Sequence, residues 1–144
     1  MLALAPFKAE HFNKLDIQPA QRWAVRHVGK ELLKGLESSG WSTTVLKDGA
    51  PVFVGGVMSN AEHCGTVWCY IGLGLTQQEF VSLHKYVLRF IEALPYRRLD
   101  MVVSVDHREG HRWAALLGFT CEAQRMRAFL VNGEDAALYA RVRG

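Results

Sequence analysis

The feature of this sequence that most constrains its fold is a strand, helix and strand in the middle, with a clearly marked helix start. Residues 66–71 (TVWCYI) strongly favour a β-strand, and residues 99–105 (LDMVVSV) show a second buried strand pattern. Between them, Thr76 and Glu79 have the spacing of a capping box, in which two side chains satisfy exposed amides of the helix start. Apolar residues at helical spacing then continue to Pro95. Strands joined by such a helix are expected to lie parallel with a right-handed crossover.

The rest of the chain supplies the other elements of a mixed sheet. Alternating and β-branched patterns predict strands at 2–7, 41–46, 51–58 and in a last hairpin from 119–121 to 142. Helical spacing predicts helices at 8–15, at 21–39 and at 107–117, and residues 59–65 are expected to form a polar loop. The predicted order is β-α-α-β-β-β-α-β-α-β-β. This order indicates an α/β (α+β) fold with a mixed, mostly antiparallel central sheet and one parallel, splayed strand pair.

Length and composition favour one ordinary globular domain over residues 1–144. Hydrophobic residues make up 49% of the chain and charged residues 22%, which excludes a disordered or fibrous class. No apolar run is long enough to span a membrane, and residues 1–8 (MLALAPFK) lack the basic lead of a signal peptide, so we expect a cytoplasmic protein. Cys64, Cys69 and Cys121 are an odd number of cysteines, which fits free thiols in a reducing compartment.

The charge distribution leaves two interpretations open. Seventeen Lys and Arg against fourteen Asp and Glu give a net charge of +3. Much of the basic charge lies late in the chain, at Arg97, Arg98, Arg108, Arg112, Arg125, Arg127, Arg141 and Arg143. A solvated basic face is favoured over a nucleic-acid site, because no aromatic-interleaved nucleic-acid motif accompanies these arginines. Such a face would also suit a phosphorylated cofactor.

The last third of the chain carries the best local signal of a family. Residues 97–103 (RRLDMVV) lead through a short helix to 117–119 (LGF), and a hairpin containing 132–135 (NGED) follows. This arrangement, together with the order of elements over nearly the whole length, resembles the GCN5-related N-acetyltransferase (GNAT) superfamily. The resemblance implies a protein that transfers an acetyl group from acetyl-CoA, as co-substrate, to an amine that the sequence does not identify.

The resemblance also implies where acetyl-CoA would bind, in the gap between the strand that ends at Ile71 and the strand that ends at Val105. Physical reasoning supports this position, because a loop before a capped helix presents free backbone amides and the positive end of the helix dipole to a phosphate. The residues that we expect to bind the cofactor through their backbones are Leu73, Gly74, Leu75, Thr76, Gln77 and Gln78.

Three features depart from the superfamily's pattern. The usual phosphate loop has Arg or Gln, two residues, Gly, one residue, then Gly or Ala, whereas residues 72–78 read GLGLTQQ. Counted back from 117–119, the position of the superfamily's frequent catalytic Tyr holds Ala114, which cannot protonate a thiolate. The position of its frequent Asn after the fifth strand holds His107.

Two residues are candidates for proton transfer. His107 is expected at the end of the 99–105 strand, where an imidazole with a near-neutral pKa could act as a general base. A helix-start residue that faces solvent is an equally good interpretation. Asp106 could orient His107, but capping the next helix is its favoured role. Tyr70 could donate a proton if its side chain faces the cleft. His107 and His111 do not have the zinc-protease spacing, because residues 107–111 read HREGH, so we expect no metal site.

The departures leave a second class of function open. Residues 54–57 (VGGV), the aromatic strand at 67–68 and residues 112–119 (RWAALLGF) are similar to acetyltransferase-like proteins of tailed bacteriophages. That resemblance implies a catalytically weak or inactive protein with a virion or assembly partner. A nucleic-acid-binding module is the third and least favoured hypothesis. The sequence leaves the oligomeric state open.

Overall fold

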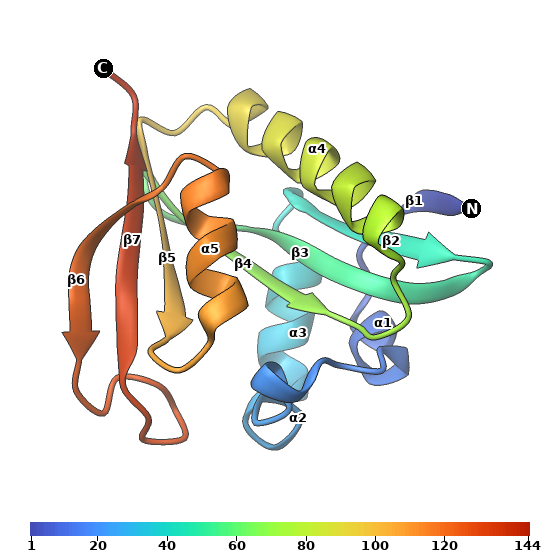
Figure 1. Ribbon diagram of the computed structural model, residues 1–144. Helices are drawn as coiled ribbons and strands as arrows, with labels where there is room; N and C mark the ends of the chain where they lie inside the picture. Colours follow the sequence, from blue (N-terminus) through green and yellow to red (C-terminus); the bar gives the residue numbers. More distant parts are fainter. The chain divides into compact units, whose positions relative to one another are not determined.

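The computed structural model describes residues 1–144 and contains one mixed seven-stranded sheet with helices (Figure 1). The strands are β1 (Leu2–Pro6), β2 (Ser42–Lys47), β3 (Ala50–Ala61), β4 (Cys64–Ile71), β5 (Arg98–Ser104), β6 (Thr120–Met126) and β7 (Ala136–Val142). The helices are α1 (Ala9–Lys14), the 3₁₀ turn η1 (Pro19–Gln21), α2 (Ala24–His27), α3 (Lys30–Glu37), α4 (Gln77–Ala93) and α5 (Arg108–Leu116). The strands follow the order β1-β2-β3-β4-β5-β7-β6, and β4 with β5 is a parallel pair. The predicted mixed, mostly antiparallel sheet is therefore confirmed.

The chain forms two compact units, and the first comprises Met1–Met58 and Val67–Leu83. Its core lies between the helices α1 to α3 and the strands β3 and β4. Apolar side chains from these elements are buried together, and Trp68 and Tyr70 of β4 pack against them. Phe12 meets Tyr70 edge-to-face at 5.1 Å between ring centroids, and Phe7 meets Trp68 in the same way at 5.3 Å. The face of β4 that carries Trp68 and Tyr70 is thus directed at the helix layer.

The second unit comprises Ser59–Thr66 and His84–Gly144. Its strands β5, β7 and β6 form an antiparallel sheet, and the parallel ladder joins Cys64–Thr66 to Arg98–Asp100. Helix α5 packs against β5, and the buried Trp113 of α5 donates its indole N–H to His84 Nδ1 of α4 at 2.9 Å. This hydrogen bond ties the two helices of the unit together.

The structure confirms the predicted unit of strand β4, helix α4 and strand β5. It also confirms the predicted hairpin of β2 and β3. Helix α4 begins directly after Thr76 and ends before Pro95, and β5 lies parallel to β4. Between β2 and β3, Asp48 and Gly49 both have positive φ, 51° and 83°, which is the geometry of a type I′ hairpin turn. The last hairpin has a longer connection, and residues 132–133 lie inside it.

The predicted helix over residues 21–39 is wrong, because the structure divides this segment into η1, α2 and α3. Val28 has an extended backbone with ψ of 106°, and Gly29 precedes α3 with ψ of 167°. Glycine is a poor residue for a helix interior, and here it serves as the residue before the first helical turn. The apolar spacing was real, but it belongs to two short helices that bury their apolar side chains in the same core.

The predicted loop over residues 59–65 is also wrong. Strand β3 continues to Ala61 and β4 begins at Cys64, so only Glu62 and His63 form the turn. Residues 58–61 are exposed, and Ser59 and Asn60 give this segment the polar character of a loop although its backbone belongs to a strand. Asn60 donates to Thr66 Oγ1 at 2.6 Å, which links the two arms of this hairpin.

Candidate functional site

The loop between β4 and α4 is held by backbone hydrogen bonds in the first unit. The N–H of Gly72 donates to the carbonyl of Val52 at 2.7 Å, and the N–H of Leu73 donates to the carbonyl of Asp16 at 2.7 Å. Gly74 then has a φ of +94°, a conformation that L-residues rarely adopt. The sequence needs glycine there to turn the chain from the strand into the helix.

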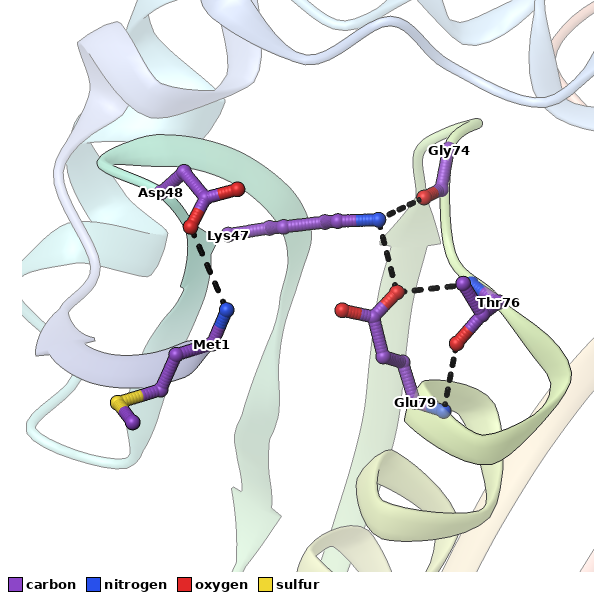
Figure 2. A network of polar contacts seen from close by, with 6 residues as sticks. All are labelled: Met1, Lys47, Asp48, Gly74, Thr76 and Glu79. Carbon is purple, nitrogen blue, oxygen red and sulfur yellow. Dashed lines mark hydrogen bonds and ion pairs between the residues drawn. The ribbon is translucent and has the colours of Figure 1, made fainter.

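The predicted capping box at the start of α4 is confirmed. The N–H of Thr76 donates to Glu79 Oε1 at 2.8 Å, and the N–H of Glu79 donates to Thr76 Oγ1 at 3.1 Å (Figure 2). Lys47 of β2 adds a contact that the sequence did not reveal: its ammonium donates to Glu79 Oε1 at 2.8 Å and to the carbonyl of Gly74 at 2.6 Å. The loop and the helix start are therefore tied to the β2 strand.

These contacts set the charge at the helix start. The hydrogen bond from Lys47, followed by that from the Thr76 backbone, lowers the pKa of Glu79 to about 2, so its carboxylate is ionised at neutral pH. The side chains of Lys47 and Glu79 are 27% and 20% exposed, so the pair is accessible from solvent. A carboxylate at this place repels a phosphate, but the Lys47 ammonium offsets its charge, and an ammonium is a group that commonly binds phosphate in proteins.

The six backbones that we predicted to bind the cofactor divide into two groups. The N–H groups of Leu73 and Thr76 already donate to Asp16 and Glu79. Those of Gly74 and Leu75 have no partner in the protein, and Gln77 and Gln78 occupy first-turn positions that helix geometry leaves unpaired. Four of the six predicted backbone N–H groups are thus free to donate a hydrogen bond to an anion.

The backbone of strand β4 is hydrogen-bonded to the side chain of Gln21 in the first unit, a contact that the sequence analysis missed. The carboxamide of Gln21 donates from Nε2 to the carbonyl of Cys69 at 2.8 Å and accepts the N–H of Ile71 on Oε1 at 3.0 Å. The backbone N–H of Gln18 donates to the carbonyl of Ile71 at 2.8 Å. No local pattern marks Gln21, because its partners lie about fifty residues away in the sequence.

Tyr70, the predicted proton donor, packs against Phe12 and Trp68 in the first unit. Burial, with a smaller effect of Cys69, raises the pKa of Tyr70 to about 12, so its hydroxyl stays protonated at neutral pH. A thiol has a reference pKa of about 8.5, which is lower than the pKa of Tyr70. Transfer of the Tyr70 proton to a thiolate is therefore unfavourable at equilibrium. The indole N–H of its neighbour Trp68 is buried without a hydrogen-bond partner.

His107, the predicted base, lies in the second unit as the N-cap residue of α5 and makes no side-chain capping hydrogen bond. Its ring lies over its own helix, because a Cβ added to Gly110 would be 2.6 Å from His107 Nδ1 and 2.8 Å from Val103 Cγ1. Burial lowers the pKa of His107, which favours the neutral imidazole. The favoured capping role of Asp106 is wrong, because the helix begins one residue later and no side chain caps it.

Sequence reasoning also missed a His–Tyr pair beside the end of β5. The carbonyl of Val105 accepts from His111 Nε2 at 2.8 Å, so Nε2 carries the proton and Nδ1 is left to accept from the Tyr139 hydroxyl at 2.7 Å. Tyr139 is 9% exposed, and burial raises its pKa. Both ring nitrogens of His111 are therefore engaged, and no group of three His, Cys, Asp or Glu side chains could hold a metal ion.

Most of the late arginines have partners in the second unit. Arg98 makes two hydrogen bonds to Glu122, Arg125 pairs with Asp135, and Arg141 lies 3.7 Å from Glu92. Arg143 donates to the carbonyls of Ile91 and Glu92. These contacts leave fewer arginines available to nucleic acid than the sequence suggested. None of the helices has the length and apolar character needed to cross a bilayer.

Comparison with known proteins gives similarity in structure alone. No family model matches the chain, and no curated protein matches it. Among solved structures, a GNAT-family acetyltransferase from Streptococcus pneumoniae is 16% identical, with a TM-score of 0.69 over 99% of this chain and 100% of that one. Ard1 from Thermoplasma volcanium is 14% identical, with a TM-score of 0.77 over 98% and 97% of the two chains. A GNAT-superfamily phosphinothricin acetyltransferase from Sinorhizobium meliloti, solved with AcCoA, is 15% identical, with a TM-score of 0.71 over 99% and 89%. The chain therefore has the fold of GNAT acetyltransferases.

Proposed function

We propose that this protein transfers the acetyl group of acetyl-CoA to an amine. The observation that carries the proposal is the match of nearly the whole chain to the fold of acetyltransferases, one of them solved with AcCoA. The free amides at the start of α4 support it, because they offer a phosphate group the donors and the helix dipole that it needs. The acceptor is an amine of unidentified class.

In this proposal the first unit binds the cofactor. The N–H groups of Gly74, Leu75, Gln77 and Gln78 donate to the pyrophosphate, and the ammonium of Lys47 adds a charge-assisted hydrogen bond. A negative charge at an exposed helix start gains about 0.3 to 1 kcal/mol from the helix dipole, so the dipole, the amides and Lys47 must act together. Leu73 and Thr76 act indirectly, because their hydrogen bonds hold the loop in shape.

In the second unit His107 is the proposed general base. Burial lowers its pKa, so at pH 7 the imidazole is neutral and can take a proton from the attacking amine. The amine nitrogen then forms a bond to the thioester carbonyl carbon, the carbon–sulfur bond breaks, and the thiolate leaves with the bonding electrons. The thiolate is protonated from solvent or from Tyr70, whose raised pKa makes it the weaker donor.

Calorimetric titration of acetyl-CoA and of free CoA, at low and at high salt, tests the proposal. We expect stoichiometric binding that weakens at high salt, because the pyrophosphate contributes charged contacts. A matched variant, Lys47→Met, should bind more weakly and lose much of this salt dependence. No binding of either ligand would contradict the proposal and favour the alternative, a non-catalytic assembly protein with this fold.

Release of CoA, followed in the presence of a panel of amines, then tests transfer. The panel includes phosphinothricin, amino acids, polyamines and short peptides with a free N-terminus, since phosphinothricin is named for a protein of similar fold. We expect one class of amine to raise the rate of CoA release above that of slow hydrolysis. Binding of acetyl-CoA with no acceleration by any amine would restrict the conclusion to cofactor binding.

A further inference from the structure

The contact of Gln21 with strand β4 imitates the pairing of one strand with another. Successive residues of a strand direct their N–H and C=O groups to opposite edges, so Cys69 and Ile71 present theirs to the same edge. At that edge Gln21 supplies one donor, to the carbonyl of Cys69 at 2.8 Å, and one acceptor, to the N–H of Ile71 at 3.0 Å. Gly72, the next residue, donates at the other edge to Val52 of β3. A single side-chain amide thus occupies the place of a peptide group.

The orientation of this carboxamide is fixed by its surroundings. Gln18 donates from its side-chain Nε2 to Gln21 Oε1 at 2.9 Å, so the oxygen accepts from both Gln18 and Ile71. The reverse orientation would place an NH₂ group against two donors. The backbone of Gln18 holds the carbonyl of Ile71 in addition. The segment before α2 therefore satisfies three backbone groups of the β4 edge.

The contact can be released without a change of fold. Gln21 is the last residue of η1 and is partly exposed, and its hydrogen bonds to β4 come from its flexible side chain, while its backbone N–H donates to the carbonyl of Gln18. Rotation about side-chain bonds would remove the carboxamide while the hydrogen bond from the Gln18 backbone remains. The carbonyl of Cys69 and the N–H of Ile71 would then be open to another amide.

We propose that Gln21 occupies the β4 edge in the free protein and lowers its affinity for a ligand with secondary amides, which must replace the carboxamide to bind there. The inference rests on the proposed function, because the pantetheine arm of acetyl-CoA carries such amides. A ligand amide restores one donor and one acceptor, so the exchange leaves no buried group unpaired. A ligand without amides gains nothing by displacing Gln21. The residue therefore competes with amide-bearing acyl carriers and leaves the binding of nucleotides of the same charge unaffected.

Titration of two ligands into two proteins tests this role. The ligands are CoA and adenosine 3′,5′-bisphosphate, which has phosphates but no secondary amide. In Gln21→Leu the competing carboxamide is absent, so CoA should bind about three- to tenfold more tightly, while the nucleotide binds as it does to the original protein. Gln124→Leu is the matched control, because Gln124 is exposed on β6 and should leave both affinities unchanged.

A second measurement uses the unsubstituted protein and does not depend on the folding of a variant. The side-chain NH₂ protons of Gln21, observed by NMR, should exchange slowly with solvent in the free protein and rapidly when CoA is saturating. Slow exchange in the CoA complex, or equal affinity of CoA for the original protein and Gln21→Leu, would overturn the role of Gln21 and leave the proposed function standing. Failure of CoA to bind either protein would overturn both.

Discussion

The starts of α4 and α5 differ in how their free amides are satisfied. At α4 a capping box closes the first turn, and Lys47 binds both the box and the loop before it. At α5 the N-cap residue is His107, which makes no capping hydrogen bond, and its ring lies over the helix instead. The hydrogen bonds at the start of α4 hold its first turn in place. At the start of α5 the imidazole of His107 is not used in a capping hydrogen bond. Only a capped start of the α4 kind leaves a local signature in the sequence, because its two partners are three residues apart.

The largest effect is expected at the uncapped start. His107→Ala removes the proposed base and should lower kcat by about a hundredfold, because general base catalysis contributes that much or more. The affinity for acetyl-CoA should not change, since the proposed cofactor donors belong to α4 and its loop. Steady-state assays of CoA release measure kcat, and calorimetry measures the affinity for acetyl-CoA. An unchanged kcat would remove His107 from the mechanism.

The pH dependence of the rate gives a further check on His107. Burial lowers its pKa below the ordinary 6.5, so the neutral, active form persists above that value. The rate should therefore be independent of this group at neutral pH and fall only as the solution becomes more acidic than pH 6.5. The same group contributes stability that is present above pH 6.5 and is lost as pH falls through its lowered pKa.

Gly110→Ala should disturb the position of His107 without removing it. The new Cβ would lie 2.6 Å from the imidazole Nδ1, so the ring must move. We expect kcat to fall about tenfold, because moving a catalytic group even slightly from its productive position lowers the rate of the chemical step. Ala is the better helix former, which partly offsets the crowding in the free energy of unfolding. A rate equal to that of the original protein would show that the ring position is not critical.

At the capped start, Thr76→Ala should reduce stability more than activity. Loss of an N-cap hydroxyl costs about 1 kcal/mol of the free energy of unfolding, measured by denaturant titration. Thr76→Ser keeps the hydroxyl and serves as the control. Acetyl-CoA should bind slightly more weakly to Thr76→Ala, because the loop that presents the proposed donors is less well held. A loss of stability in the serine variant equal to that in the alanine variant would contradict the capping role.

The smallest effect is expected for Asp106→Ala. The structure shows no capping hydrogen bond at α5, so removal of this exposed carboxylate should change the free energy of unfolding by less than about 0.5 kcal/mol. The same denaturant titration compares it directly with Thr76→Ala. A loss near 1 kcal/mol would mean that Asp106 caps the helix in solution and that the two helix starts are alike.

Several elements could be predicted because their causes are local. The residues of the capping box are three apart, and Asp48-Gly49 forms its turn with adjacent residues. The same local reasoning failed where one sequence pattern is compatible with two different backbone structures. The apolar spacing of residues 21–39 did not reveal the break at Gly29, and the polar residues Ser59 and Asn60 belong to an exposed part of β3.

The order of the elements and the start of α4 follow from periodicity and from short-range hydrogen bonds, so they can be predicted from the sequence. The parallel pairing of β4 with β5 can be predicted too, because a helix connects the two strands. The side-chain contacts inside each unit depend on the tertiary structure. Lys47 reaches Glu79 across 32 residues, His111 reaches Tyr139 across 28, and Gln21 reaches Ile71 across 50. These contacts form only when distant segments are folded against each other, so no local pattern encodes them.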